Sequence, residues 1–546
     1  MAAGRAAVAV VSRLFSFLWI SLVVFLRSDV AVSNADATVG LSVLGPGLID
    51  FPAFESAIVL LFTDITPWLI VIPGLLIGLT FGAIPGLQIS MAMAIFLPMT
   101  LYMDFMQAML FLTAIFTGGG FGGSIPAILM NIPGTSSAIA TAFDGYPMSR
   151  NGQHNTALGI ALGASCLGVI IGYSILLLLI DSISELVLRI GPSEMAAVIL
   201  WGISLIGSLS SGSVLKGAIS GLFGLLIGTI GYSEAGVARG TFGSAYLLDG
   251  VPVIPAMIGM FAASELFKLT LSDYLVEDSS ARKVSVRKIL SGFLSAFRHP
   301  WIVLRGSLIG VFVGAIPGVG SSVANLLSYM VTKKRSNDPD SFGKGNPSGV
   351  IASESANSTS EAGSMATLLA LGIPGGGATA VMLAAFAMHN ITGGPQFIRE
   401  QTDIVYAIII ANFGQAFLLI ALGLLFIPLL ANVIKVPMTY LVPSVLALAT
   451  FGSFGLTGDL RGPATVLVFS FVGWLFKRYD FSVPAAVIGL LLGGMAEDSI
   501  IYSYQISGGQ WSYILERPIT MFILALLVAS LFGSKLVELI TRKVSG

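Results

Sequence analysis

The sequence contains little charge, one cysteine and three histidines. Only 10% of its 546 residues are charged, whereas soluble domains carry about 25%. The formal net charge of -1 provides no basic surface for nucleic acid. Cys166 has no second cysteine to pair with, and the histidines lack the spacing of metal ligands. The motifs H-E-x-x-H and G-x-S-x-G are also missing. We therefore expect no nucleic-acid partner, no cofactor, no catalytic residue and no enzymatic activity.

Apolar residues dominate the chain instead. Hydrophobic residues make up 55% of it, and the mean hydropathy is +0.92. A spanning helix needs about 20 mostly apolar residues, and segments approaching that length recur throughout. We therefore predict an all-α polytopic membrane protein. The apolar segments lie near 6–26, 67–99, 106–122, 157–180, 195–209, 214–231, 250–272, 301–331, 364–386, 404–433, 440–455, 463–476, 484–494 and 519–540.

The pentapeptide GAIPG interrupts two of these segments, at 82–86 and again at 314–318. Proline lacks a backbone N–H and clashes with the preceding helical turn, and glycine adopts backbone angles that other residues avoid. Ile-Pro-Gly should therefore end one helix and begin another. Each leg of about 16 residues would reach about 24 Å, which is short of a hydrocarbon core of about 30 Å. The sequence thus predicts two re-entrant helical hairpins.

Other motifs also occur twice, in the same order. NIPG at 131–134 corresponds to GIPG at 372–375, and Pro192 and Lys216 correspond to Pro437 and Arg461. Internal symmetry of this kind is typical of secondary transporters, although glycine and proline are common in membrane helices and can match by chance. We predict an N-terminal extension with a signal-anchor-like helix at 1–56, a first repeat at 57–272, a linker at 273–300, a second repeat at 301–516, and a C-terminal helix and tail at 517–546.

Lysine and arginine are distributed differently around the two hairpins. None occurs between Arg27 and Arg150, whereas basic residues flank the second GAIPG segment on both sides. By the positive-inside rule, the first hairpin enters from the periplasm and the second from the cytoplasm. We therefore predict inverted-topology repeats in the bacterial inner membrane, with about 12 transmembrane helices plus the hairpins. The segment 50–64 is expected outside, and the linker 273–300, Arg150, Lys216, Lys435, Lys477, Arg478, Arg542 and the C-terminal TRKVSG inside.

The N-terminal apolar stretch at 6–26 has two interpretations. A signal peptide followed by a small-residue cleavage site and an uncleaved first helix both fit its pattern. Arg27 directly follows the apolar run, and a basic residue there is unusual for an exported flank. This placement favours a retained helix.

Backbone that leaves a helix at membrane depth is tolerated only where it is buried in protein or lines a wet cavity. Freed carbonyls can coordinate Na⁺, and the N-terminus of a half-helix can bind a carboxylate. We expect further helix breaks at NIPG (131–134) and GIPG (372–375), termed the two later breaks. We predict that they and the two GAIPG tips surround one central site; purely structural kinks are the alternative. Na⁺, or else a proton, is expected as the coupling ion, with Na⁺ near Asn131, Thr135 and Ser136. The candidate residues are Pro85, Gly86, Asn131, Pro133, Gly134, Thr135, Ser136, Ser137, Pro317, Gly318, Ser321, Ser322, Pro374, Gly375 and Gly376.

A polar run, SGVIASESANSTSEAGS, precedes the second of the later breaks and contains Glu354, Asn357 and Glu361. An ionisable group near membrane depth is a functional hypothesis by default, so Glu354 and Asn357 join the candidate binding residues. The density of serine and asparagine leaves a solvated loop as the alternative.

Three other charged residues are expected to be structural. Asp144, in the motif FDGYPM, should cap or turn the chain. Lys216 and Arg461 lie at loop ends. We expect these two side chains to anchor the helix ends rather than to hold a substrate.

Several motifs together resemble one family. GAIPGL, GGSIPAILMNIPGTSSAIATAFDGYPM, GAIPGVGSSVANLLSYM, FGKGNPSGVIASESAN and LGIPGGGATAVML look like the large membrane subunit of the bacterial tripartite tricarboxylate transporters. The family's Pro-Glu-Ser-Ala-Asn-Asn is matched at Glu354 and Asn357 but not at Ser353 and Ser358. The resemblance covers about 67–500. It implies a secondary transporter that imports carboxylates such as citrate with a cation gradient, together with a small membrane subunit and a periplasmic solute-binding protein.

Two other membrane functions are alternatives. A channel needs a continuous pore, and hairpins that meet at mid-membrane would obstruct one. The second alternative is an organic anion transporter that needs no binding protein. A homodimer is a possible assembly of this chain. Because the predicted hairpins never cross the membrane, we expect them to move with the substrate, as in an elevator, against a scaffold at 195–272 and 440–516.

Overall fold

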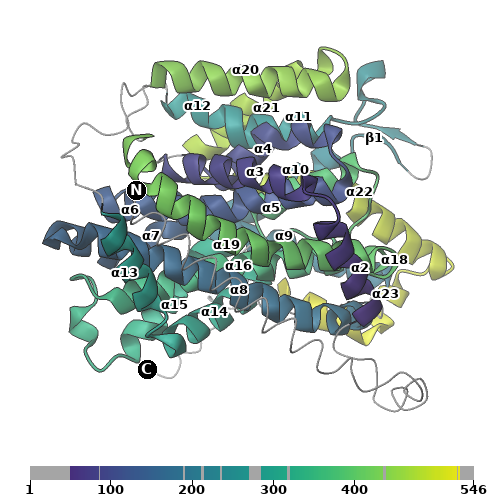
Figure 1. Cartoon of the computed structure of the whole chain (residues 1–546). Helices are drawn as coiled ribbons and strands as arrows, with labels where there is room; N and C mark the ends of the chain where they lie inside the picture. Colours follow the sequence, from purple (N-terminus) through teal and green to yellow (C-terminus); the bar gives the residue numbers. More distant parts are fainter. Residues whose placement is uncertain are drawn as a thin grey trace, which may run out of the picture. The chain divides into compact units, whose positions relative to one another are not determined.

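The computed structural model describes residues 50–528, apart from 85–86, 188–190, 211–213, 234–236, 270–284, 317–319, 434–437 and 526. In this part of the chain nearly all regular structure is helical, and two short strands form an antiparallel hairpin (Figure 1). The predicted all-α class is confirmed. The expected helix at 6–26 and most of the one at 519–540 lie outside the described residues.

The elements up to residue 269 are α2 (Phe51–Phe62), α3 (Thr66–Ala83), α4 (Ile89–Phe96), η1 (Leu97–Tyr102), α5 (Phe105–Gly122), α6 (Ser124–Met130), η2 (Ser136–Ala138), α7 (Ile139–Met148), η3 (Ser149–Gln153), α8 (His154–Val187), α9 (Pro192–Ser210), α10 (Val214–Gly228), β1 (Gly231–Tyr232), β2 (Ala238–Arg239), η4 (Ala245–Leu247), α11 (Val253–Ile258), η5 (Gly259–Ala263) and α12 (Ser264–Leu269). They include helices over the predicted apolar segments from 67–99 onward, and further elements, such as α2, α6 and α7, that lie outside those segments.

The remaining elements are helical throughout. They are α13 (Val286–Ala296), α14 (Pro300–Gly314), α15 (Gly320–Lys334), η6 (Pro339–Ser341), α16 (Pro347–Leu371), α17 (Gly377–Met388), α18 (Pro395–Glu400), α19 (Thr402–Val433), α20 (Met438–Thr457), α21 (Arg461–Arg478), α22 (Val483–Ile506) and α23 (Ser512–Glu516).

Five helical stretches in the described residues are long and apolar enough to cross a membrane. They are Thr66–Ala83, Phe105–Met130, Ser136–Ile183, Thr402–Ile427 and Val483–Ile506. Seven shorter apolar helices accompany them. Together with the composition, these stretches make the chain a multi-pass membrane protein.

Both GAIPG motifs interrupt a helix, as predicted. Helix α3 ends at Ala83 and α4 begins at Ile89, while α14 ends at Gly314 and α15 begins at Gly320. The legs differ from the predicted uniform length: α3 has 18 residues and α14 has 15. At 1.5 Å per residue α3 reaches about 27 Å. Its length alone would therefore allow it to cross a thin bilayer.

Glycines bring the first leg of each hairpin close to a neighbouring helix. Gly78 of α3 faces the backbone of α5, where an added Cβ would collide with the Ile115 carbonyl and lie 2.7 Å from the Gly119 nitrogen. Gly310 of α14 meets the backbone of α16 at Ala356 in the same way. Small residues spaced by four let membrane helices approach closely. These contacts fix α3 on α5 and α14 on α16.

The polar run before the second break is a helix rather than a solvated loop. It forms α16, and every residue from Gly349 to Ala370 is buried. Its hydroxyls mostly donate to carbonyls three or four residues earlier, as Ser355 does to Ile351 (2.8 Å). The loop alternative is therefore wrong. The predicted apolar segment 364–386 is divided between the end of α16 and α17.

The predicted linker 273–300 contains helix α13, which packs against α8. An added Cβ at Gly163 of α8 would lie 2.6 Å from the Phe293 carbonyl, and one at Gly292 of α13 would collide with the Thr156 carbonyl. The described part of this linker is thus fixed to the helix bundle by close backbone contact.

Candidate functional site

Both later Ile-Pro-Gly breaks begin at a residue in the left-handed conformation. Asn131 ends α6 with φ 60°, and Gly372 ends α16 with φ 66°. Glycine and asparagine tolerate this region best, so each helix stops before its proline is reached. The chain becomes helical again at η2 and α7 after the first break and at α17 after the second. Each break thus brings helix-end carbonyls and helix-start N–H groups within a few residues of each other.

Each break lies against the first leg of a hairpin. An added Cβ at Gly134 would collide with the carbonyl oxygen of Gly82, the first residue of the first GAIPG. An added Cβ at Gly375 would lie 3.0 Å from the carbonyl oxygen of Gly314, the first residue of the second GAIPG. The Ser364 hydroxyl also donates to Gly314 (3.1 Å). Glycine is therefore required at these points for close approach.

The second leg of each hairpin contacts the other break. The Ser322 hydroxyl, near the start of α15, donates to the Ser136 hydroxyl (2.8 Å). An added Cβ at Gly377, at the start of α17, would lie 3.3 Å from Cβ of Ser90 in α4. Residues from the two predicted repeats are therefore in direct contact around the breaks.

The four hairpin-tip residues, Pro85, Gly86, Pro317 and Gly318, lie outside the described residues. Their approach to the breaks therefore stays a prediction, as does a central cavity.

The other candidates around the breaks differ in exposure. Thr135 and Ser137 are each 3% exposed, and their hydroxyls are 3.0 Å apart. Asn131 and Ser136 are exposed. Of the three predicted sodium ligands, Thr135 alone is therefore buried. Pro374 and Gly375 are buried, while Pro133, Ser321 and Gly376 are partly exposed.

Glu354 is fully buried among hydroxyl groups. Its Oε1 accepts hydrogen bonds from Ser124 (2.6 Å) and from Thr141, and its Oε2 accepts one from Ser165 (2.9 Å). Three different elements, α6, α7 and α8, supply these donors. In the described part of the chain no lysine, arginine or histidine pairs with this carboxylate. The carboxylate thus joins α16 to the elements on either side of the first break.

Asn357 links α16 to α5, one turn after Glu354. Its side-chain nitrogen donates to the Gly120 carbonyl (3.2 Å), and the residue is 4% exposed. The structure therefore places both candidates of the polar run inside the helix bundle. Within the described residues, the hydrogen bonds of these two side chains go to α5, α6, α7 and α8 and not to the breaks at 131–137 and 372–377.

Asp144 fixes the loop that leads into α16. Its Oδ1 accepts from the backbone nitrogens of Gly343 (2.8 Å), Gly345 (2.9 Å) and Asn346 (2.8 Å). Its Oδ2 accepts from the Tyr329 hydroxyl (2.9 Å). Gly343 and Gly345 have φ 84° and 107°, which lets successive N–H groups point at one anion. Asp144 thus has structural partners, but it lies inside α7 and binds a distant loop instead of capping or turning the chain at FDGYPM as predicted.

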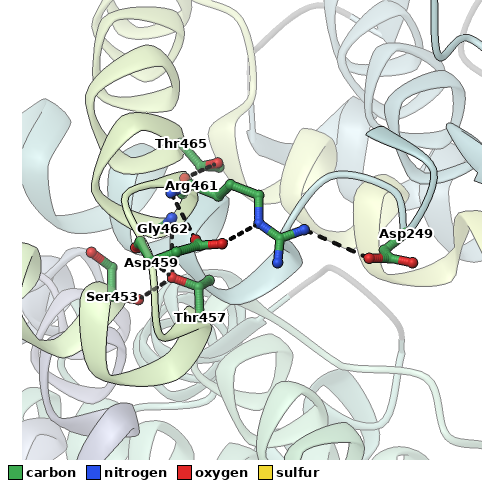
Figure 2. A network of polar contacts seen from close by, with 7 residues as sticks. All are labelled: Asp249, Ser453, Thr457, Asp459, Arg461, Gly462 and Thr465. Atoms are coloured by element: carbon green, nitrogen blue, oxygen red, sulfur yellow. Dashed lines mark hydrogen bonds and ion pairs between the residues drawn. The ribbon is translucent and has the colours of Figure 1, made fainter. Parts of the chain in front are cut away.

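Arg461 and Lys216 are held by other loops, as expected for anchors. Figure 2 shows Arg461 between Asp459 (2.6 Å) and Asp249 (3.6 Å). Asp459 and Arg461 border a pocket of about 630 Å³. Because both carboxylates neutralise the guanidinium, the pocket has no free cation from Arg461 for an anionic substrate. Lys216 donates to the carbonyl of Tyr479 (2.7 Å).

The described residues contain no group of three histidine, cysteine, aspartate or glutamate side chains that could hold a metal ion. An alkali cation coordinated by neutral oxygens does not need such a group.

Sequence reasoning missed the hydroxyl partners of the buried glutamates. They are Ser124, Thr141 and Ser165 for Glu354, and Thr117 and Tyr173 for Glu361. A usable signal did exist, because a glutamate inside a bundle must find donors. The sequence offered too many serines and threonines to select these five.

Comparison with known proteins identifies similar sequences. Residues 68–488 match the family described as the tripartite tricarboxylate transporter TctA family. An uncharacterized 52.8 kDa protein from the TAR-I ttuC' 3' region of Agrobacterium vitis is 32% identical over 456 residues, which cover 83% of this chain and 90% of that protein. An uncharacterized protein from the TAR-II ttuC' 3' region of the same organism is 30% identical over 221 residues, 40% of this chain and 90% of that protein. No solved structure matches the chain.

Proposed function

The chain belongs to the tripartite tricarboxylate transporter TctA family, and on that premise we propose that it is the large membrane subunit of a secondary active importer of di- and tricarboxylates such as citrate. It acts in the bacterial inner membrane with a small membrane subunit and a periplasmic solute-binding protein. A cation gradient, with Na⁺ as the coupling ion, drives uptake.

One observation carries this proposal: both later breaks contact both hairpins. Broken helices in corresponding positions of two halves are the best sequence pointer to a transport site. The contacts join residues that flank the two GAIPG motifs to residues of both later breaks. The four contacts are Gly82 with Gly134, Gly314 with Gly375, Ser322 with Ser136, and Ser90 with Gly377.

Helix ends supply the chemistry for an anionic substrate at this place. The start of α17, where the Gly376 nitrogen is held by the Thr379 hydroxyl (3.0 Å), offers N–H groups and a positive dipole end to a carboxylate. The start of α7 does the same for the other break. Carbonyls at the ends of α6 and α16, with the Thr135 hydroxyl, suit Na⁺. A bound cation offsets the substrate's charge, so each ligand should bind poorly without the other.

The ion pairs outside the bundle support the inverted topology. Lys216, expected inside, lies 4.0 Å from Asp480, which closely follows Lys477 and Arg478 in the chain. Arg239, which follows α10 and is thus expected outside, pairs with Glu497 of α22 (2.5 Å). The two contacts lie beyond or near opposite ends of α10, which agrees with a position of Lys216 inside and Arg239 outside. On this topology the hairpins move with substrate and Na⁺ against the scaffold at 195–272 and 440–516.

Sodium-driven citrate uptake tests the proposal. We expect vesicles that contain both membrane subunits to accumulate labelled citrate only with an inward Na⁺ gradient and the binding protein. Thr135→Val removes the buried hydroxyl at constant shape and should raise the Na⁺ concentration for half-maximal uptake at least tenfold. Asn131→Gly keeps the left-handed backbone and removes the side-chain amide. It should also raise the Na⁺ concentration for half-maximal uptake.

The matched control is Thr450→Val, because the Thr450 hydroxyl donates only to the Leu446 carbonyl of its own helix (2.8 Å). It should leave the Na⁺ dependence unchanged. Unaltered Na⁺ dependence in both Thr135→Val and Asn131→Gly would remove these residues from the ion site. Uptake that needs neither gradient nor binding protein would contradict the proposed function itself.

A further inference from the structure

A second buried carboxylate, Glu361, lies two turns after Glu354 on α16. Its Oε1 accepts from the Thr117 hydroxyl of α5 (2.8 Å) and from the Tyr173 hydroxyl of α8 (3.1 Å). Glu361 is 2% exposed and Tyr173 is fully buried. Neither the hairpins nor the two later breaks supply these partners, so Glu361 belongs to a cluster separate from the proposed substrate site.

Two buried amide oxygens of α19, which packs against α5, have no hydrogen-bond partner among the described residues. The Gln415 side-chain nitrogen of α19 donates to the Thr113 hydroxyl (2.9 Å) and to the Leu110 carbonyl (3.1 Å). The Oε1 of Gln415 and the Oδ1 of Asn412 have no partner among the described residues, although both residues are fully buried. An unmet buried acceptor costs about 1–3 kcal/mol. We therefore expect each of these oxygens to accept a hydrogen bond from a donor such as water.

The two parts of the cluster are adjacent. Thr113 and Thr117 are one helical turn apart on α5, so their side chains lie on the same face. Thr113 contacts Gln415, and Thr117 contacts Glu361. Polar groups from α5, α8, α16 and α19 thus lie near one another inside the bundle.

Cations do not neutralise Glu361 in the described part of the chain. Among the titratable groups on the elements packed against α16, Tyr173 is the one recorded in contact with it. The others have different partners or positions: Arg305 of α14 bonds Thr332, Tyr329 of α15 bonds Asp144 of α7, and Tyr406 of α19 bonds Asp181 of α8. The titratable residues His154, Cys166, Glu185, Tyr146, Lys333, Lys334, Arg399 and Glu400 also lie on these elements, and Asp403 lies on α19. Helices α5 and α17 carry no titratable side chain.

We propose that Glu361 is a proton-carrying site of the transport cycle, reached through a polar row that Thr113, Thr117, Asn412 and Gln415 form with water. A carboxylate oxygen of Glu361 takes a proton from a hydronium ion, so a hydronium O–H bond breaks as the Glu361 O–H bond forms and water remains. On release to the other side the Glu361 O–H bond breaks and a water molecule becomes hydronium. The proposal rests on the proposed transport function and adds a second coupling ion at a place distinct from the Na⁺ ligands.

The physical argument is the cost of an unpaired charge. An ionised carboxylate buried without a cation costs several kcal/mol even after relaxation, and two neutral hydroxyl donors compensate only part of this. Both donors reach the same carboxyl oxygen, at 2.8 and 3.1 Å. A proton removes the charge without enlarging the site, which is why we assign a proton rather than a second Na⁺.

The test follows proton movement with a pH-sensitive dye inside vesicles that contain the whole transporter. Citrate is added at about pH 8, where its carboxyl groups are ionised. We expect wild-type protein to acidify the interior during uptake. Glu361→Gln should reduce this acidification at least tenfold while citrate exchange across the membrane continues. Glu55→Gln, an exposed carboxylate on α2, should behave as wild type.

Wild-type-like acidification by Glu361→Gln, or citrate uptake by the wild type without acidification, would overturn the proton site while leaving the transport function intact. If Glu361→Gln does not fold, Tyr173→Phe and Thr117→Val each remove one hydroxyl donor to the same oxygen. Both should shift the pH at which uptake is half-maximal, and an unchanged midpoint in both would overturn the proposal. Absence of any citrate uptake by the wild type would instead count against the proposed function.

Discussion

Asp144→Ala is expected to cause the largest loss of stability of any single side-chain truncation considered for this protein. The alanine leaves the N–H groups of Gly343, Gly345 and Asn346 without their acceptor and the Tyr329 hydroxyl without its partner. Each lost bond to a charged acceptor contributes about 1.5–3 kcal/mol when buried, and three of the four groups are only partly buried. We expect a destabilisation of about 3–5 kcal/mol in total.

Asp144→Asn provides the matched comparison. Its side-chain oxygen can still accept from the three N–H groups, and its nitrogen can donate to the Tyr329 oxygen instead. Thermal unfolding followed by size-exclusion chromatography in detergent should show little folded Asp144→Ala and a majority of folded Asp144→Asn. Equal recovery of the two variants would show that the N–H groups of this loop do not depend on the carboxylate.

Gly78→Ala is expected to separate α3 from α5 and to destabilise the first hairpin. The added Cβ meets the Ile115 carbonyl and the Gly119 nitrogen, and both are backbone atoms that cannot rotate away. Overpacking of a tight contact costs about 1–3 kcal/mol. Alanine also forms helix better than glycine by about 1 kcal/mol, which offsets part of this loss, so the measured effect is the difference.

Gly494→Ala isolates the helix-propensity term. Gly494 lies within α22, is exposed, and has no atom within 4 Å of an added Cβ. The melting temperature of the Gly494→Ala variant should stay the same or rise, while that of Gly78→Ala should fall by several degrees. A rise in both would mean that α3 and α5 adjust to the extra methyl group without cost.

The sequence predicts the helix interruptions well because their causes are local. Proline and glycine act on their own backbone and that of the preceding turn, which accounts for the breaks at GAIPG and NIPG. The motif alone is not sufficient, because Ile72-Pro73-Gly74 lies inside α3 without ending that helix. The close packing of α3 was also available from the spacing of Gly74, Gly78 and Gly82. The prediction that Asp144 caps or turns its own segment was wrong, because Asp144 lies inside α7 and its carboxylate binds a loop about 200 residues further along the chain.

The surroundings of the buried glutamates could not be predicted from one sequence. The donors to Glu354 come from residues 189 to 230 positions away in the chain. Their approach depends on how α8 and α16 pack, which periodicity does not specify. The serine-rich composition of α16 also resembles that of a loop, because serine favours turns as well as buried hydrogen bonds to its own helix. Tertiary burial thus decides the structure of this segment.

Cysteine accessibility in intact bacterial cells tests the central claim, that the two hairpins enter from opposite sides and meet at one site. Asp64→Cys and Lys334→Cys, each in a Cys166→Ala background, place a single thiol at an exposed position before the first hairpin and at the end of the second. A maleimide that cannot cross the membrane should label residue 64 in intact cells and residue 334 only after permeabilisation. Labelling of both thiols from the same side would contradict the inverted repeats and the shared site built on them.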